Sequence, residues 1–138
     1  MIGVVITSHG NLARELYNSA RLIVGDQPQV ETVALQEAET PASLIQRLNQ
    51  AVEAVDRGQG ALVLADLLGG TPANASLRLV GNPRVACLTG ANLAMVLEAL
   101  TERDRGMDLG TLAERCAEAG QRGIRDLGQV ADQAANSR

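Results

Sequence analysis

The stretch from Ile2 to Asn11 reads IGVVITSHGN, and it decides the fold. Its first half is an apolar run rich in β-branched residues, without the alternation that a half-exposed strand shows. Such a run predicts a strand buried on both faces, as in a parallel sheet covered by helices. The polar residues Ser8, His9 and Gly10 then interrupt the run, and apolar residues recur after them at helical spacing. We therefore expect a strand, a loop and the start of a helix.

The same order of strand and helix recurs along the chain. Short apolar strands are predicted at residues 30–35, 61–65 and 84–88, and each is followed by a segment with helical apolar periodicity. Strands that alternate with helices over short connections predict parallel pairing and right-handed crossovers. We expect a doubly wound α/β fold, with a mostly parallel sheet of four to five strands in the flavodoxin-like order 2-1-3-4.

The C-terminal end has a weaker pattern than the rest of the chain. Gly123–Leu127 is compatible with a short strand at the edge of the sheet, and residues 128–138 are polar and Ala-rich without a core pattern. We expect one domain over residues 1–127 and a polar tail over residues 128–138.

Composition excludes several classes of function. The 138 residues include 12 Arg and 16 acidic residues, for a net charge of −4, with no Lys, one His and a single aromatic residue, Tyr17. Without Lys the chain has no Walker-type P-loop, no Schiff-base chemistry and no kinase site of the usual type. The net acidity and the lack of stacking aromatics argue against a nucleic-acid partner. One His and two separated Cys do not make an ordinary zinc site, so we expect no metal and no cofactor.

The chain also lacks the features of a secreted or membrane protein. Its first residues have neither the basic start nor the long apolar core of a signal peptide. No apolar stretch approaches the ~18 residues of a membrane span. Cys87 and Cys116 fit as small buried residues. We expect a cytoplasmic protein without membrane insertion.

Two residues converge on the edge of the sheet where ligands bind. In the order 2-1-3-4 the topological switch point lies between the first and third strands, outside their carboxyl ends. His9 follows the first strand and Asp66 ends the third. A carboxylate that accepts the Nδ1 proton fixes the tautomer of the imidazole and leaves the Nε2 lone pair free. We therefore predict His9 as the nucleophile and Asp66 as its orienting partner; a structural His and a turn-capping Asp are the alternatives.

The loops beside this pair suit an anion. Glycines allow the backbone to approach closely, and N–H groups at a helix start attract phosphate. The alternative is that these loops only form turns and cap helices. The predicted phosphoryl-binding residues are Ser8, Gly10, Asn11, Gly69, Gly70 and Thr71.

Three segments together resemble the mannose/fructose/sorbose-type enzyme IIA domain of the bacterial phosphoenolpyruvate:sugar phosphotransferase system (PTS). They are VVITSHGNLARELYNSARLIVG (residues 4–25), ALVLADLLGGTPANASLRL (residues 61–79) and LTGANLAMVLEAL (residues 88–100). The resemblance covers about residues 1–127. It implies a cytoplasmic histidine phosphocarrier, in which the residue matching His9 accepts a phosphoryl group from phospho-HPr and passes it to a IIB protein.

The resemblance also implies roles for other parts of the chain. The residue matching Asp66 hydrogen-bonds the phosphorylated His, and the loop Gly69–Pro72 helps to line the site. The family fold ends in an antiparallel edge strand, which Gln121–Leu127 matches, and the proteins are usually homodimers.

Other functions on this fold differ in the residues they need. A response-regulator receiver would use Asp66 as its phosphoryl acceptor and Thr89 as its hydroxyl, but it also needs an acidic pair after the first strand and a Lys. A flavin binder would need aromatic side chains beside the ring. Two alternatives stay open: the phosphotransfer subunit of a dihydroxyacetone kinase system, and a regulatory module whose phosphorylation controls binding to another protein. The sequence specifies neither the sugar nor the IIB acceptor.

Overall fold

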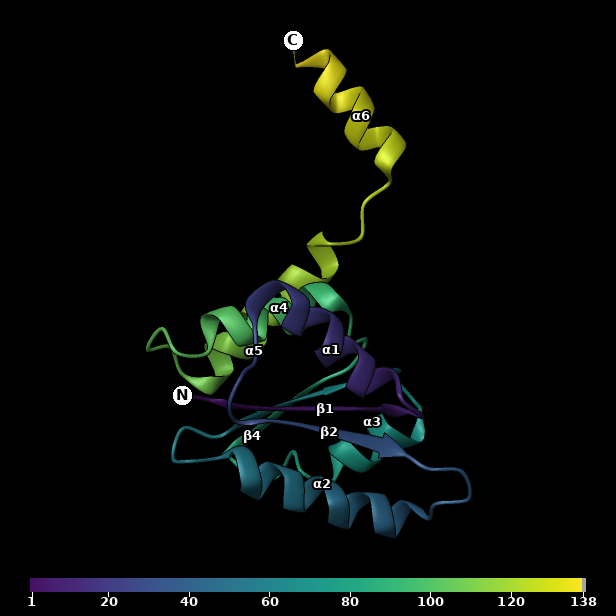
Figure 1. The fold of residues 1–138 in the computed structure, drawn as a ribbon, viewed down its shortest axis with the longest axis vertical. Coiled ribbons are helices and arrows are strands. Elements are labelled where there is room, and N and C mark those ends of the chain that lie inside the picture. Colours follow the sequence, from purple (N-terminus) through teal and green to yellow (C-terminus); the bar gives the residue numbers. More distant parts are fainter. Residues whose placement is uncertain (138) are drawn as a thin grey trace.

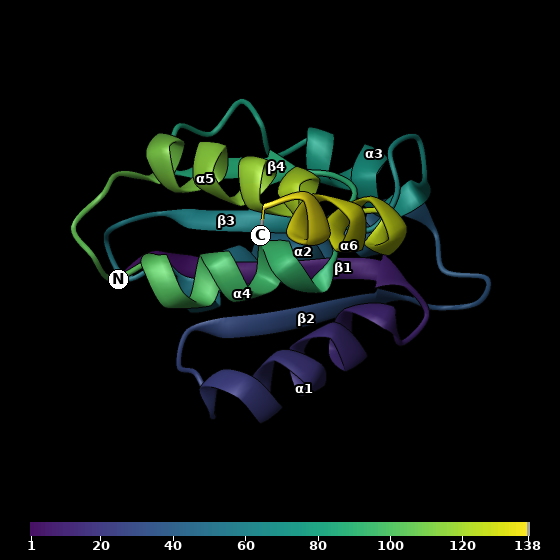
Figure 2. The ribbon, with the colours of Figure 1, turned by 90° about the horizontal axis from the view of Figure 1, so that it is seen from above.

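The computed structural model describes residues 1–137 and contains a four-stranded parallel sheet. The strands are β1 (Gly3–His9), β2 (Val30–Leu35), β3 (Ala61–Ala65) and β4 (Val85–Leu88), in the order β2-β1-β3-β4. This confirms the predicted order, which Figure 2 shows from above the sheet. β1 pairs with β2 as far as His9 but with β3 only as far as Thr7, so His9 extends past the end of β3.

Helices cover both faces of the sheet (Figure 1). Those found within the described residues are α1 (Leu12–Val24), α2 (Pro41–Val55), α3 (Thr71–Leu77), α4 (Leu93–Glu102), α5 (Leu109–Arg122) and α6 (Leu127–Asn136). One apolar cluster joins β1 and β3 to α1, α4 and α5, and the other joins the opposite face to α2 and α3. Both faces of the central strands are therefore buried, as their unbroken apolar runs predict.

Side chains cap the starts of several helices, but not that of α3. The side chains of Thr40 and Asp108 accept hydrogen bonds from the N–H groups of Ser43 and Thr111, at 3.2 and 2.8 Å. In α3, Gly70 occupies the cap position, while Thr71 is the first helical residue and makes no capping bond. The helix ends at Leu77 because the next N–H groups bond three residues back, which tightens the chain into turns.

The C-terminal segment corrects two expectations. Gly123–Leu127 forms no edge strand in the part of the chain that the structure describes, and the expected polar tail is helical as far as Asn136. Asp126 caps α6 by accepting the N–H of Gln129 at 3.2 Å, and Ala-rich sequence favours helix. Local capping and helix propensity therefore make residues 127–136 helical without an apolar core pattern. α6 extends away from the sheet in Figure 1 and has no buried residue.

No helix among residues 1–137 combines the length and the hydropathy needed to cross a membrane.

Candidate active site

His9 and Asp66 lie side by side at the carboxyl edge of the sheet. The backbone N–H of His9 donates to Asp66 Oδ2 at 2.9 Å, and His9 Nδ1 lies 2.8 Å from the same oxygen. The N–H of Asp66 in turn donates to the carbonyl oxygen of Thr7 at 3.2 Å, which continues the β1–β3 pairing by one residue. The Asp66 side chain is 9% exposed and that of His9 is 50% exposed. The structure thus brings the predicted pair together, with the ring open to a partner.

The negative charge of Asp66 determines which ring nitrogen of His9 carries the proton. Burial alone would raise the pKa of Asp66, but the hydrogen bonds from the ring and backbone of His9 outweigh burial and hold that pKa below its usual range. An ionised carboxylate only accepts hydrogen bonds, so Nδ1 carries the ring proton. Nε2 then has a free lone pair, and it makes no hydrogen bond within the described residues. Of the two ring nitrogens, Nε2 is therefore the one with the lone pair that a nucleophile needs.

The glycine loop before α3 packs directly against the imidazole. A Cβ atom built on Gly70 would lie 2.8 Å from His9 Cε1, so only glycine fits beside the ring in this position. Gly69 has a φ of +86°, a left-handed conformation that favours glycine for a different reason. Thr71 follows, and its hydroxyl makes no hydrogen bond within residues 1–137. Gly70 thus lies against the His9 ring, and Gly69 and Thr71 flank it in the chain.

The other predicted phosphoryl-binding residues belong to the turn after β1. Gly10 has a φ of +53° and donates its N–H to the carbonyl oxygen of Leu35 at 3.2 Å. Asn11 takes the cap position of α1 but makes no capping bond through its side chain. Ser8 is buried; its hydroxyl accepts the N–H of Ala13 at 2.7 Å and donates to the Gly10 carbonyl oxygen at 3.3 Å. Phosphoryl binding by Ser8 stays a prediction, because the hydroxyl is already engaged by α1.

Sequence reasoning missed two features of the site. Asn74 holds the glycine loop, since its N–H donates to the Gly70 carbonyl oxygen at 2.9 Å and its Nδ2 to that of Gly69 at 3.4 Å. The pair Leu67 and Leu68, 61% and 80% exposed, forms an apolar rim between Asp66 and the loop. Two adjacent leucines outside any strand or helix were the signal for this rim.

Neither cysteine has the lowered thiol pKa of a reactive cysteine. Burial raises the pKa of the Cys87 thiol to about 11, and burial together with the nearby Glu98 carboxylate raises that of Cys116 to about 12. Both thiols are therefore protonated at neutral pH, and the thiolate is the reactive form.

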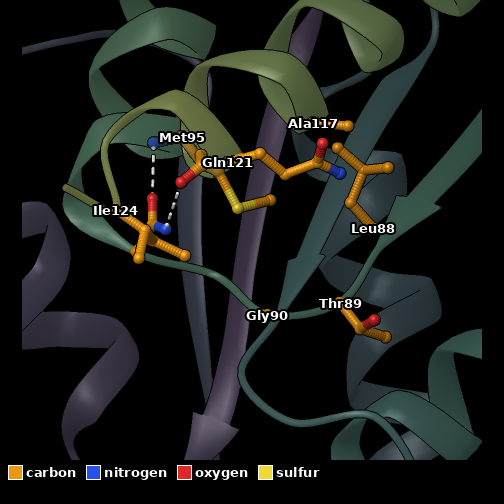
Figure 3. Close-up of a pocket in the computed structure, with 9 residues that line it drawn as sticks. Leu88, Thr89, Gly90, Met95, Ala117, Gln121 and Ile124 are labelled. Atoms are coloured by element: carbon orange, nitrogen blue, oxygen red, sulfur yellow. Dashed lines mark hydrogen bonds between the residues drawn. The ribbon is translucent and has the colours of Figure 1, made fainter.

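A pocket of about 190 Å³ lies at the carboxyl end of β4 (Figure 3), and neither His9 nor Asp66 is among its lining residues. Leu88, Met95, Gln121 and Ile124 are among its lining residues. The dashed lines in Figure 3 mark the Asn92 side chain, which accepts the N–H of Met95 and donates to the Gly120 carbonyl oxygen. No titratable side chain lines this pocket. Within the described residues no three His, Cys, Asp or Glu side chains are grouped to hold a metal ion.

Fold and site together define a class: doubly wound α/β proteins with a histidine–carboxylate pair at the topological switch point of the sheet. A family model described as the PTS system fructose IIA component matches residues 3–117. The chain belongs to this mannose/fructose/sorbose family of PTS EIIA components, the phosphotransfer components of sugar uptake.

Individual members of the family are similar to this chain in sequence and in structure. The mannose-specific EIIAB component of Escherichia coli (strain K12) is 31% identical over 127 residues, which cover 91% of this chain and 39% of that protein. The fructose-specific EIIA component of Bacillus subtilis (strain 168) is 30% identical over 105 residues, covering 75% of this chain and 72% of that protein. The EIIA crystal structure from Streptococcus agalactiae has a TM-score of 0.85 and 30% identity, covering 94% and 99% of the two chains. The chain thus spans about two fifths of the E. coli relative and nearly all of the streptococcal one.

Proposed function

We propose that this chain is a histidine phosphocarrier: His9 accepts a phosphoryl group from phospho-HPr and passes it to a IIB acceptor during sugar uptake. The observation that carries the proposal is the 2.8 Å contact between Nδ1 and the ionised Asp66, which leaves an exposed Nε2 as the acceptor atom. Family membership supports HPr as donor and IIB as acceptor. The family resemblance also supports a homodimer as the acting form.

The transfer needs no proton movement at His9. The Nε2 lone pair attacks phosphorus, a new N–P bond forms, and the bond from phosphorus to the donor's imidazole nitrogen breaks, with the electron pair left on the donor. The Nδ1 proton stays in place, so the phosphorylated ring is cationic and Asp66 neutralises it. Passing the group to the acceptor reverses these steps. Such a relay depends mainly on positioning and electrostatics.

The loops around the ring supply contacts for the phosphoryl oxygens. Gly69, Gly70 and Thr71 lie on one side of His9, and Gly10 and Asn11 follow it in the chain. Backbone N–H groups in such turns, together with the Thr71 hydroxyl, are donors suited to an anion. Ser8 contributes by holding the turn that carries His9.

Phosphorylation of the wild type and His9→Ala tests the proposal. With labelled phosphoenolpyruvate, enzyme I and HPr, we expect an acid-labile phosphoryl group on the wild type and none on His9→Ala, because His9 is the sole histidine. Label that survives His9→Ala would overturn the assignment. Labelled protein that transfers to no IIB protein would instead favour the regulatory alternative.

A second arm asks whether the step from HPr to His9 needs a metal. HPr is phosphorylated beforehand and separated from magnesium, and the transfer is then followed with EDTA present. We expect transfer at an unchanged rate, because backbone N–H groups, a hydroxyl and Asp66 are the proposed stabilising groups. A requirement for added metal at this step would contradict the proposed role of the loops.

A further inference from the structure

We propose that the backbone of Gly70 is a steric stop that holds the His9 ring against Asp66, so that Gly70 is a positioning residue for phosphoryl transfer. The inference rests on the proposed function and adds a role beyond phosphate contact.

The conformation of Gly70 does not itself require glycine. Its φ of −76° and ψ of 163° are extended backbone that any residue adopts, unlike the φ of +86° at Gly69. The neighbouring atoms do require it. A Cβ atom on Gly70 would lie 2.8 Å from His9 Cε1 and 3.6 Å from Nε2, and its next contact, the Leu67 carbonyl oxygen at 3.3 Å, needs only a small shift. The imidazole is therefore the reason that this position lacks a side chain.

Gly70 cannot move away from the ring easily, because its backbone is bonded on both sides. Its N–H donates to the Leu67 carbonyl oxygen at 3.1 Å, and its carbonyl oxygen accepts the N–H of Asn74 at 2.9 Å. Asn74 Nδ2 also reaches the carbonyl oxygen of Gly69. The imidazole is half exposed and is the freer of the two groups. A methyl group at position 70 would therefore displace the ring rather than the loop.

Displacing the ring separates it from Asp66. The bond between Nδ1 and Oδ2 depends on the ring position, whereas the bond from the His9 backbone N–H to the same oxygen does not. Asp66 stays in place, but the ring no longer has a fixed tautomer or a fixed direction for Nε2. Gly70 thus acts on the reaction through the His9–Asp66 pair, which distinguishes it from a residue that only contacts the phosphoryl group.

Gly70→Ala and Gly25→Ala form a matched pair of variants. Gly25 follows the C-terminal end of α1 and has a φ of +80°, and a Cβ there meets no atom within 4 Å, so that variant strains the backbone without touching the ring or the glycine loop. For Gly70→Ala we expect single-turnover transfer from phospho-HPr about 100-fold slower than in the wild type, which is typical of a reacting group misplaced by about 1 Å. For Gly25→Ala we expect a lower melting temperature with transfer within about threefold of the wild type.

Nitrogen NMR of the ring reports its position without any phosphoryl transfer. His9 is the only histidine, so protein labelled with ¹⁵N-histidine gives one pair of ring signals. We expect a protonated Nδ1 and an unprotonated Nε2 in the wild type and in Gly25→Ala at mildly alkaline pH. In Gly70→Ala the two signals should move toward those of imidazole free in water, while the melting curve stays cooperative.

Combining Gly70→Ala with Asp66→Asn identifies the route of the effect. If Gly70 acts through the pair, the double variant transfers no more slowly than the slower single variant. Losses that multiply would assign Gly70 to the phosphoryl group directly and overturn the proposal, as would wild-type ring signals or a wild-type rate in Gly70→Ala. A wild type that takes no label would refute the proposed function instead, while the ring signals would still test the steric stop.

Discussion

At the scale of single residues, Asp66 holds both the backbone and the ring of His9 with one oxygen atom. Oδ2 accepts the His9 N–H at 2.9 Å and lies 2.8 Å from Nδ1, while the buried Oδ1 has no hydrogen-bond partner within the described residues. The first bond sets where the histidine leaves β1, and the second sets which ring nitrogen faces solvent. Loss of the carboxylate charge should therefore affect the reaction more than the fold.

Asp66→Asn removes the charge that neutralises the phosphorylated ring in the proposed mechanism, and it keeps a side chain of the same size. A hydrogen bond to a charged group contributes about 1.5–3 kcal/mol, so we expect phosphoryl transfer to slow roughly 10- to 150-fold. Asp66→Ala should slow transfer in the same direction, with the fold intact. Rapid-quench kinetics with phospho-HPr measure the effect, and Asp26→Asn, at an exposed acid, is the control. A wild-type rate in Asp66→Asn would remove Asp66 from the mechanism.

At the scale of secondary-structure elements, the sequence predicted the strands and helices whose signals lie within a few neighbouring residues. The apolar run of β1 and the Thr40-Pro41 start of α2 are both encoded within a few residues, and the β1 strand forms as expected. The approach of His9 to Asp66 was also predictable, because the strand order places the carboxyl ends of β1 and β3 together. The helix α6 was missed because its sequence has a capping residue and a high helix propensity, but no repeated apolar residues that would pack into a core.

Contacts between elements were harder to predict than the elements themselves. Ser8 was expected to bind a phosphoryl group, but its hydroxyl reaches from β1 into the first turn of α1. The glycines at positions 69 and 70 look alike in the sequence, yet one supplies a positive φ and the other makes room for a ring. Neither the bonding of the Ser8 hydroxyl nor the difference between the two glycines can be predicted from neighbouring residues, because each depends on where another element lies.

Ser8→Ala tests the link between β1 and α1. The Ser8 hydroxyl takes the capping role that Asn11 does not, and loss of a cap costs about 0.5–2 kcal/mol. We expect the free energy of unfolding in urea to fall by about 1 kcal/mol, while Ser8→Thr keeps the bond and most of the stability. The exposed Ser19→Ala is the control. An unfolding midpoint that does not change in Ser8→Ala would show that this cap contributes nothing.

At the scale of the whole molecule, the carboxyl and amino edges of the sheet have different roles. The carboxyl edge carries His9, Asp66 and the glycine loop. The amino edge is held by Arg103, which is 1% exposed at the end of α4. Its guanidinium donates to the carbonyl oxygens of Pro28 and Gln29 at 2.6 and 3.2 Å, and to Gln27 Oε1 at 3.2 Å. Arg103 thereby ties α4 to the connection between α1 and β2.

Arg103→Met should separate stability from activity. The substitution keeps the bulk of the side chain but leaves the Pro28 carbonyl oxygen without its donor, and an unsatisfied buried acceptor costs about 1–3 kcal/mol. We expect the melting temperature to fall accordingly, with Arg105→Met as the control, because Arg105 is exposed and pairs only with Glu102 at the surface. Phosphoryl transfer measured well below the melting temperature should match the wild type, since the length of β1, roughly 20 Å, separates Arg103 from His9. A transfer rate that fell together with stability would mean that the two edges of the sheet are coupled, and that the site depends on the amino edge as well as on its own loops.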